Sequence, residues 1–193
     1  MELHVVRFHV AKAYLDMARA VIDLKLQAPS HDSMNDAEFG LVSCTYVYSY
    51  MSITAFVSGQ LFDRWNREGS NLKENHDQYE VFEQFMRKEA PDLKSGLKLL
   101  CNELKIKKHH EIAPTTWQEL TKFLKDYRDY FVHPNPEDFN GIMTKIREIP
   151  RNFASSTAVS VIGHYFDELN QERPDWLKKP SLFIPKVRVD GKR

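Results

Sequence analysis

One short stretch of the chain combines residue types that can do acid–base chemistry on a phosphate ester. It runs from Lys125 to Pro134 and contains Arg128, Asp129 and His133. A neutral histidine can accept the proton of a ribose 2′-hydroxyl, because its ordinary pKa lies near neutral pH. An arginine can hold a phosphate with its two-pronged guanidinium and stabilise the charge that develops on the phosphate oxygens. These residue types therefore indicate RNA cleavage without a metal, with Asp129 orienting either partner.

A helix predicted over Thr116–Phe131 places this stretch at its C-terminal end. Thr116 and Glu119 have the spacing of a capping box. Pro134 disfavours the helical conformation at His133, so the helix is predicted to end there. Five residues of ideal helix would hold the Arg128 and His133 side chains about 140° apart, and a break lets them approach. Apolar residues at three- and four-residue steps define the predicted buried face: Trp117, Leu120, Phe123, Leu124, Tyr127 and Phe131.

The run from Arg128 to His133, followed by Pro134, resembles the R-polar-x-x-x-H signature of HEPN-domain proteins. The resemblance implies an all-helical fold and the metal-independent endoribonuclease activity of toxins and antiviral effectors. It assigns Arg128 and His133 as the catalytic residues and Asp129 as their support. It also implies RNA as the substrate, a homodimer that completes the site, and a protein antitoxin as a further partner.

A second interpretation of the same stretch needs no catalysis. Arg128 would pair with a surface acid such as Asp126 or Glu137, and His133 would lie where a helix end favours a cation. The chain would then be a helical interaction or regulatory module. Its 27 basic and 27 acidic residues favour this interpretation, because nonspecific nucleic-acid binding needs an excess of basic residues. A metal- or haem-dependent bundle enzyme ranks third, because the sequence lacks the carboxylate and histidine spacing of such sites.

The densest basic cluster contains Lys105, Lys107 and Lys108 and follows a helix predicted over Leu93–Leu104. Cations at that position interact favourably with the helix dipole. Alternatively, the three lysines contact RNA phosphates, since a cationic patch is the electrostatic footprint of a nucleic-acid binder. The neighbouring residues His109–Glu111 are not predicted to bind a metal, because consecutive side chains point apart. No metal or other cofactor is predicted.

The chain has 193 residues and only seven glycines, which indicates one all-α domain. We expect an antiparallel helical bundle with additional short helices over residues 1–172; the alternative is an irregular helical array. The first helix is predicted to bury Val10, Tyr14 and Met17, and Ser155 or Ser156 is predicted to cap the last one. The bundle helices are predicted at Leu3–Gln27, Asp36–Trp65, Thr116–Phe131 and Ser156–Gln171, and the shorter ones at Tyr79–Lys88, Leu93–Leu104 and Phe139–Ile149.

Residues 173–193 are predicted to form an irregular, proline-rich basic tail. Basic residues outnumber acids there by seven to two, and Pro174, Pro180 and Pro185 disfavour a helix. The tail would lie on its own bundle, join a dimer partner, become ordered on RNA or remain frayed.

Three features predict a cytoplasmic location and no membrane partner. No apolar run is predicted to be long enough to span a bilayer, and the first residues do not resemble a signal peptide. Cys44 and Cys101 lie within helical patterns among apolar residues, so they are predicted to be reduced core thiols.

Overall fold

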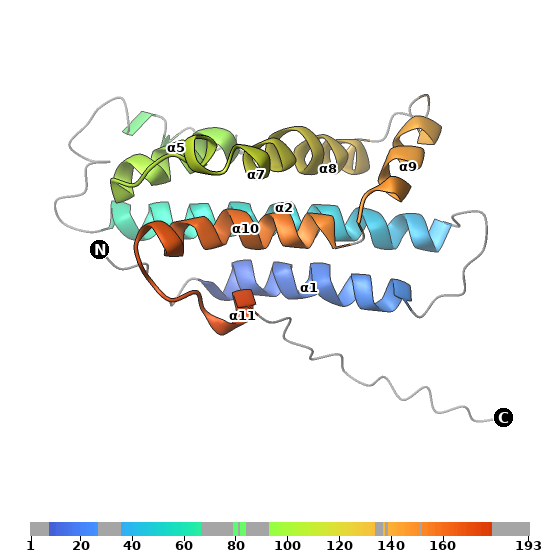
Figure 1. Ribbon diagram of the computed structural model, residues 1–193, viewed down its shortest axis with the longest axis horizontal. Helices are drawn as coiled ribbons and strands as arrows, with labels where there is room; N and C mark the ends of the chain where they lie inside the picture. The colour runs from blue at the N-terminus through green and yellow to red at the C-terminus, as the bar shows by residue number, and fades with distance from the viewer. Residues whose placement is uncertain are drawn as a thin grey trace.

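Helices make up all the regular secondary structure in the described part of the chain, which confirms the all-α prediction. The computed structural model describes residues 8–26, 36–66, 79–80, 82–83, 93–133, 137, 139–150 and 152–178. Four long helical segments alternate in direction and form a bundle (Figure 1). They are α1 (Phe8–Leu26), α2 (Asp36–Trp65), the consecutive pieces from Pro114 to Val132, and α10 (Phe153–Glu168). Shorter helices are α5 (Leu93–Leu104), α6 (His109–Ile112), α9 (Phe139–Glu148) and α11 (Asp175–Lys178).

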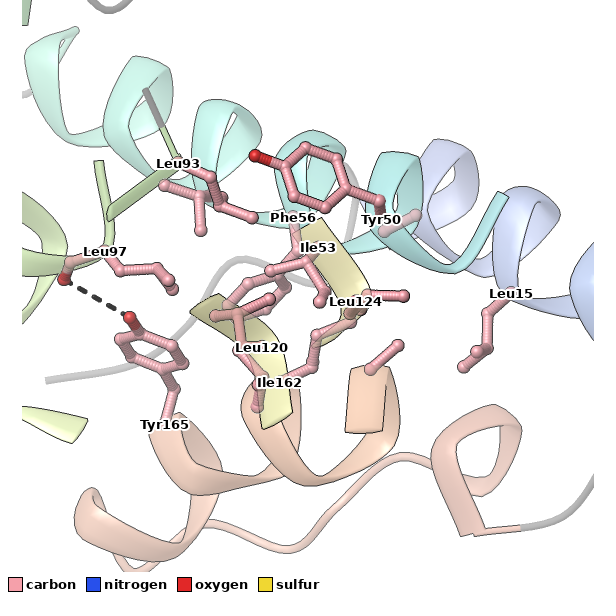
Figure 2. Packing of buried hydrophobic residues seen from close by; sticks show 14 of the residues in the cluster. Leu15, Tyr50, Ile53, Phe56, Leu93, Leu97, Leu120, Leu124, Ile162 and Tyr165 are labelled. Carbon is pink, nitrogen blue, oxygen red and sulfur yellow. Dashed lines mark hydrogen bonds between the residues drawn. The ribbon is translucent and has the colours of Figure 1, made fainter. Parts of the chain in front are cut away.

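The central helix of the bundle is α2, which contacts α1, α5, α8 and α10. Its buried residues Ile53 and Phe56 pack among Leu120, Leu124 and Ile162 (Figure 2). At one end of this core, the buried Tyr165 hydroxyl donates a hydrogen bond to the Leu97 carbonyl at 3.3 Å. The core therefore joins α2 to α5, to α10 and to the segment that carries the Arg128 motif.

By length and composition alone, the Phe39–Trp65 part of α2 could cross a membrane. The prediction that no apolar run is long enough was therefore wrong. Half of its most apolar window is buried inside the protein. The central helix of a bundle has the same length and composition, because it is surrounded by other helices.

The buried face of α1 differs from the predicted one by about one position. Ala11, Leu15 and Ala18 are fully buried, whereas Val10 is 56 % and Met17 44 % exposed. The prediction followed the large apolar side chains, but two of these three fully buried residues are alanines. Small side chains let two helices pack closely, and close packing favours the face that carries them.

The helix ends test the predicted boundaries. The bounds of α2 and α5 match the prediction. Helix α10 begins at Phe153 with Asn152 in the N-cap position, so the predicted serine cap was wrong. Ser155 and Ser156 lie in the first turn, where their hydroxyls donate to the carbonyls of Asn152 and Phe153. Pro150 precedes this start and already stops α9, which explains the earlier boundary.

The region predicted as an irregular tail contains a helix. Helix α11 follows Pro174, and its Leu177 is buried. Arg19 of α1 holds this segment by donating to the carbonyls of Trp176 and Leu177, at 2.7 and 3.2 Å. The prediction that proline excludes helix was therefore wrong for Asp175–Lys178, since proline is well tolerated just before a helix. Residues 179–193 lie outside the described residues.

The helix predicted at Tyr79–Lys88 is confirmed only where the structure describes it, at residues 79–80 and 82–83. The Trp65 ring stacks on Phe82, with centroids 4.9 Å apart, and lies 5.2 Å from Tyr79. The end of α2 is therefore held by an aromatic cluster.

Candidate active site

The helix predicted over Thr116–Phe131 is built from three consecutive pieces. Helix α7 (Pro114–Gln118) begins at a proline, with Ala113 as its N-cap, so the predicted capping box at Thr116 was wrong. The π-helix η2 (Glu119–Leu124) follows, and α8 (Lys125–Val132) continues from it. A π-helix bonds each N–H to the fifth carbonyl back, so its turn is wider than that of an α-helix and holds an extra residue.

The wide turn changes which side chains of this segment are buried. Leu120, Leu124 and Tyr127 lie in the core, as predicted. Phe123 was predicted to be buried but is 44 % exposed. The prediction assumed 3.6 residues per turn throughout, so it misplaced Phe123, which lies inside the π-turn.

Two contacts fix the guanidinium of Arg128. Its Cζ atom lies 4.1 Å from the centroid of the Tyr50 ring, which α2 supplies. Its Nη1 atom lies 2.9 Å from Asp129 Oδ1, so its ion-pair partner is Asp129 and not the Asp126 or Glu137 considered from the sequence. The side chain is 17 % exposed, and its buried Nε has no hydrogen-bond partner among the described residues. Arg128 is thus held in one orientation, and its Nε–H group makes no hydrogen bond to the described residues.

Asp129 connects two cations. Its Oδ2 atom accepts a hydrogen bond from Lys125 Nζ at 2.7 Å, one turn earlier on the same helix. This contact raises the pKa of Lys125. Burial raises the pKa of the Tyr50 hydroxyl, and a side-chain hydrogen bond with Arg128, together with the Arg128 charge, opposes that effect. At neutral pH the group therefore contains two cations, one carboxylate and one neutral hydroxyl.

His133 lies at the end of α8 and is exposed to solvent. Its backbone has left the helical conformation, with φ −129° and ψ 69°, which confirms the break predicted from Pro134. Its N–H still donates to the Asp129 carbonyl at 2.9 Å. Within one chain Arg128 is therefore enclosed against Tyr50, while the His133 imidazole is available at the surface.

The basic cluster lies at the other end of the same helical run. Lys105 and Lys107 are exposed and Lys108 is half-buried, between α5 and α6. From Pro114 to His133 the helical run rises by roughly 28 Å at about 1.5 Å per residue. Figure 1 shows α5 and α8 toward opposite ends of this helical run, so the lysines that follow α5 do not border Arg128 and His133 in one chain.

The structure instead brings different residues close to the motif. A pocket of about 220 Å³ is lined by Tyr50, Leu93, Lys94, Leu120, Thr121 and Lys125. Tyr50 and Leu93 were predicted as core residues, whereas nothing in the local pattern indicated Lys94 or Thr121. Their convergence depends on α5 packing against α2 and on the wide turn of η2.

His109, which directly follows the basic cluster in the sequence, is buried in the core, with 2 % of its surface exposed. Its ring meets the ring of His164 edge-on at 4.4 Å. Burial is the main reason that the pKa of His109 is lowered to about 4, and the nearby His164 and His110 add to the effect. Among the described residues, no group of three or more His, Cys, Asp or Glu side chains is placed to hold a metal ion. Two histidines alone do not make a typical protein metal site.

Comparisons of the chain with protein-family models, with curated proteins and with solved structures found no match. The HEPN resemblance thus rests on the motif residues, together with an all-helical fold that suits it.

Proposed function

We propose that this chain is a HEPN-like, metal-independent endoribonuclease. The observation that supports it most is the arrangement on α8: Arg128 is fixed by Tyr50 and Asp129, and His133 is exposed at the helix break. A catalytic arginine must be oriented before the transition state forms, and its two contacts supply that orientation. A general base must be reachable by substrate, and His133 is exposed.

In the proposed reaction, His133 accepts the proton of a ribose 2′-hydroxyl. The 2′-oxygen attacks the adjacent phosphorus, and the bond from phosphorus to the 5′-oxygen breaks. Arg128 stabilises the charge on the non-bridging oxygens, while Asp129 keeps its guanidinium in place. The leaving 5′-oxygen takes a proton from water. The products are a 2′,3′-cyclic phosphate and a 5′-hydroxyl.

Arg128 and His133 are proposed to complete their site across a homodimer in the cytoplasm, with a protein antitoxin as a further partner. Lys105, Lys107 and Lys108 would then contact the RNA far from the bond that is cut.

The test is cleavage of a 5′-labelled RNA by the purified full chain in the presence of EDTA. We expect fragments with 2′,3′-cyclic ends and a loss of at least about 100-fold in rate for His133→Ala and Arg128→Lys. Arg128→Lys keeps the charge but removes the two-pronged fork. His110→Ala is the matched control, because His110 is an exposed histidine outside the motif. Intact RNA, or equal cleavage by all variants, would refute the proposal.

A second candidate is a non-catalytic interaction module, and one observation favours it. Asp129 already neutralises Arg128, whose side chain is largely covered. In that case Arg128→Ala lowers the stability of the fold. His133→Ala then changes neither the stability of the protein nor the amount of intact RNA. The exposed His133 therefore separates the two functions better than Arg128.

A further inference from the structure

The pocket beside η2 is distinct from the proposed catalytic pair, because neither Arg128 nor His133 lines it. Helix α2 supplies Tyr50, α5 supplies Lys94, and the other polar side chains come from η2 and α8. Figure 2 shows the Tyr50 ring with its hydroxyl directed toward the Leu93 side of the core. Two leucines, Leu93 and Leu120, provide the apolar part of the wall.

The polar groups of the pocket suit an anion that accepts hydrogen bonds. Lys94 and Lys125 bring two positive charges. The pKa of Tyr50 is raised, so its hydroxyl keeps its proton and can donate. The Thr121 hydroxyl donates to the Trp117 carbonyl at 2.7 Å and therefore offers only its lone pairs. Among the described residues that line the pocket, none carries a carboxylate.

Asp129 would compete with a bound anion for Lys125, because its carboxylate pairs with Lys125 at 2.7 Å. It also pairs with Arg128 at 2.9 Å. Lys125 can therefore turn toward a bound anion without leaving the Asp129 carboxylate unpaired. Its side chain is 47 % exposed, which leaves it room to turn.

We propose that this pocket binds a phosphate group, carried either by a phosphomonoester or by the backbone of an RNA strand. Charge-assisted hydrogen bonds from ammonium groups and a hydroxyl are the usual means of holding phosphate. The volume of about 220 Å³ is small for a drug-sized ligand and admits a phosphate with its sugar. Single π-turns occur frequently at functional sites, and η2 forms one side of this pocket. The inference does not require RNA cleavage.

The experiment measures binding to the full chain by calorimetry with three probes. They are inorganic phosphate, adenosine 5′-monophosphate and a 2′-O-methyl oligonucleotide that lacks a terminal phosphate. The third probe has no free 2′-hydroxyl, so it cannot be cleaved and reports binding alone. Binding of the first two identifies a phosphomonoester site, and binding of the third alone identifies a backbone site.

The deciding variant is a double variant that combines Lys94→Gln with Lys125→Gln. We expect it to bind the probe about tenfold or more weakly than the wild-type protein. The matched control is Lys98→Gln with Lys122→Gln, which removes two exposed lysines from the same helical segments but outside the pocket. The control should stay within about twofold, because distant surface charges are screened by salt. Tyr50→Phe should weaken binding while leaving the ring under Arg128. An equal loss in both lysine pairs, or no binding of any probe at millimolar concentration, would overturn the proposal.

Discussion

At the scale of single residues, His109 is a histidine buried in the core in its neutral form. It packs against His164 and lies 6.2 Å from the Trp117 ring. Both of its ring nitrogens lack a hydrogen-bond partner among the described residues. A charged imidazole there would lose its hydration without gaining a counter-ion, so the folded protein favours the neutral form.

We therefore predict that the protein loses stability as the pH falls from about 6.5 toward 4. The unfolded chain binds the proton with the ordinary pKa near 6.5, whereas folded His109 binds it only near 4. Below pH 4, His109 is protonated in both the folded and the unfolded states, so it causes no further loss of stability. The loss at His109 amounts to about 3 kcal/mol, and His164, whose pKa burial also lowers, acts in the same direction. Urea denaturation at pH 7, 5.5 and 4.5 measures it.

His109→Phe should flatten this pH dependence, because it keeps a ring in the core but removes the titrating group. His110→Gln, on the exposed neighbour, should weaken the dependence only slightly, because burial is the main cause of the low His109 pKa and His110 is the last of its three causes. A steep acid loss that persists in the His109→Phe protein would mean that other groups cause it.

His109 also shows what the sequence does not reveal at this scale. Its neighbours are lysines and another histidine, a pattern typical of a surface. Its burial comes from His164 on α10, which lies far along the chain. Local patterns describe contacts within one helix, whereas contacts between distant segments depend on the whole bundle.

At the scale of elements, η2 is the feature that shapes the pocket. Because a π-turn holds one residue more than an α-turn, removing one residue should convert it to α-helix. We predict that deletion of the exposed Lys122 leaves the fold nearly intact but narrows the pocket. Circular dichroism should show the same helicity, and phosphate binding should fall by about fivefold or more.

Deletion of the exposed Asp126 is the control, because it lies in the regular α-helix α8. There the loss of one residue rotates every later side chain by about 100° and moves the buried Tyr127 and Tyr130. That variant should lose several kcal/mol. If the Lys122 deletion is equally damaging, η2 is required for the fold and does not serve mainly to shape the pocket.

The end of α5 contains a conformation that lysine rarely adopts. Lys105 has φ 54°, and the next N–H, of Ile106, donates to the Cys101 carbonyl at 3.1 Å in a helix-ending turn. Glycine adopts this left-handed conformation without steric cost. We predict that Lys105→Gly stabilises the fold by about 0.5–1 kcal/mol. Lys98→Gly, in the exposed interior of the same helix, should destabilise it by about 1 kcal/mol. Thermal denaturation that ranks the two variants the other way would contradict the assignment.

The elements themselves were largely predictable, because α5 and α9 have strong periodicity and α2 is a long apolar helix, each between polar segments. Predicted boundaries were wrong where a different residue began the helix: Asn152 rather than serine before α10, and Pro114 rather than Thr116 at the start of α7. The π-turn left no trace in the sequence, since its residue types are those of an ordinary helix. The Arg128 motif was predictable, but its Tyr50 contact and the pocket lysine Lys94 required the packing of α2 and α5.

At the scale of the whole molecule, the arrangement of the motif bears on the proposed homodimer. Arg128 is enclosed beside Tyr50, whereas His133 lies exposed past the end of α8. A two-fold axis near that end would bring the same surface of two chains together. Each His133 could then face the arginine of the partner, so that one site takes one residue from each chain.

This arrangement predicts that two inactive variants restore each other. An Arg128→Lys chain retains His133, and a His133→Ala chain retains Arg128. The two variants are mixed in equal amounts, unfolded and refolded together. Half of the resulting dimers should then be heterodimers, and one of the two composite sites in each heterodimer is intact. RNA cleavage should therefore recover to about a quarter of the wild-type rate per chain, as expected for random pairing in a symmetric dimer. The mixture before refolding is the control and should recover less when exchange is slow. If the refolded mixture stays inactive while the wild-type protein cleaves RNA, then Arg128 and His133 act within one chain.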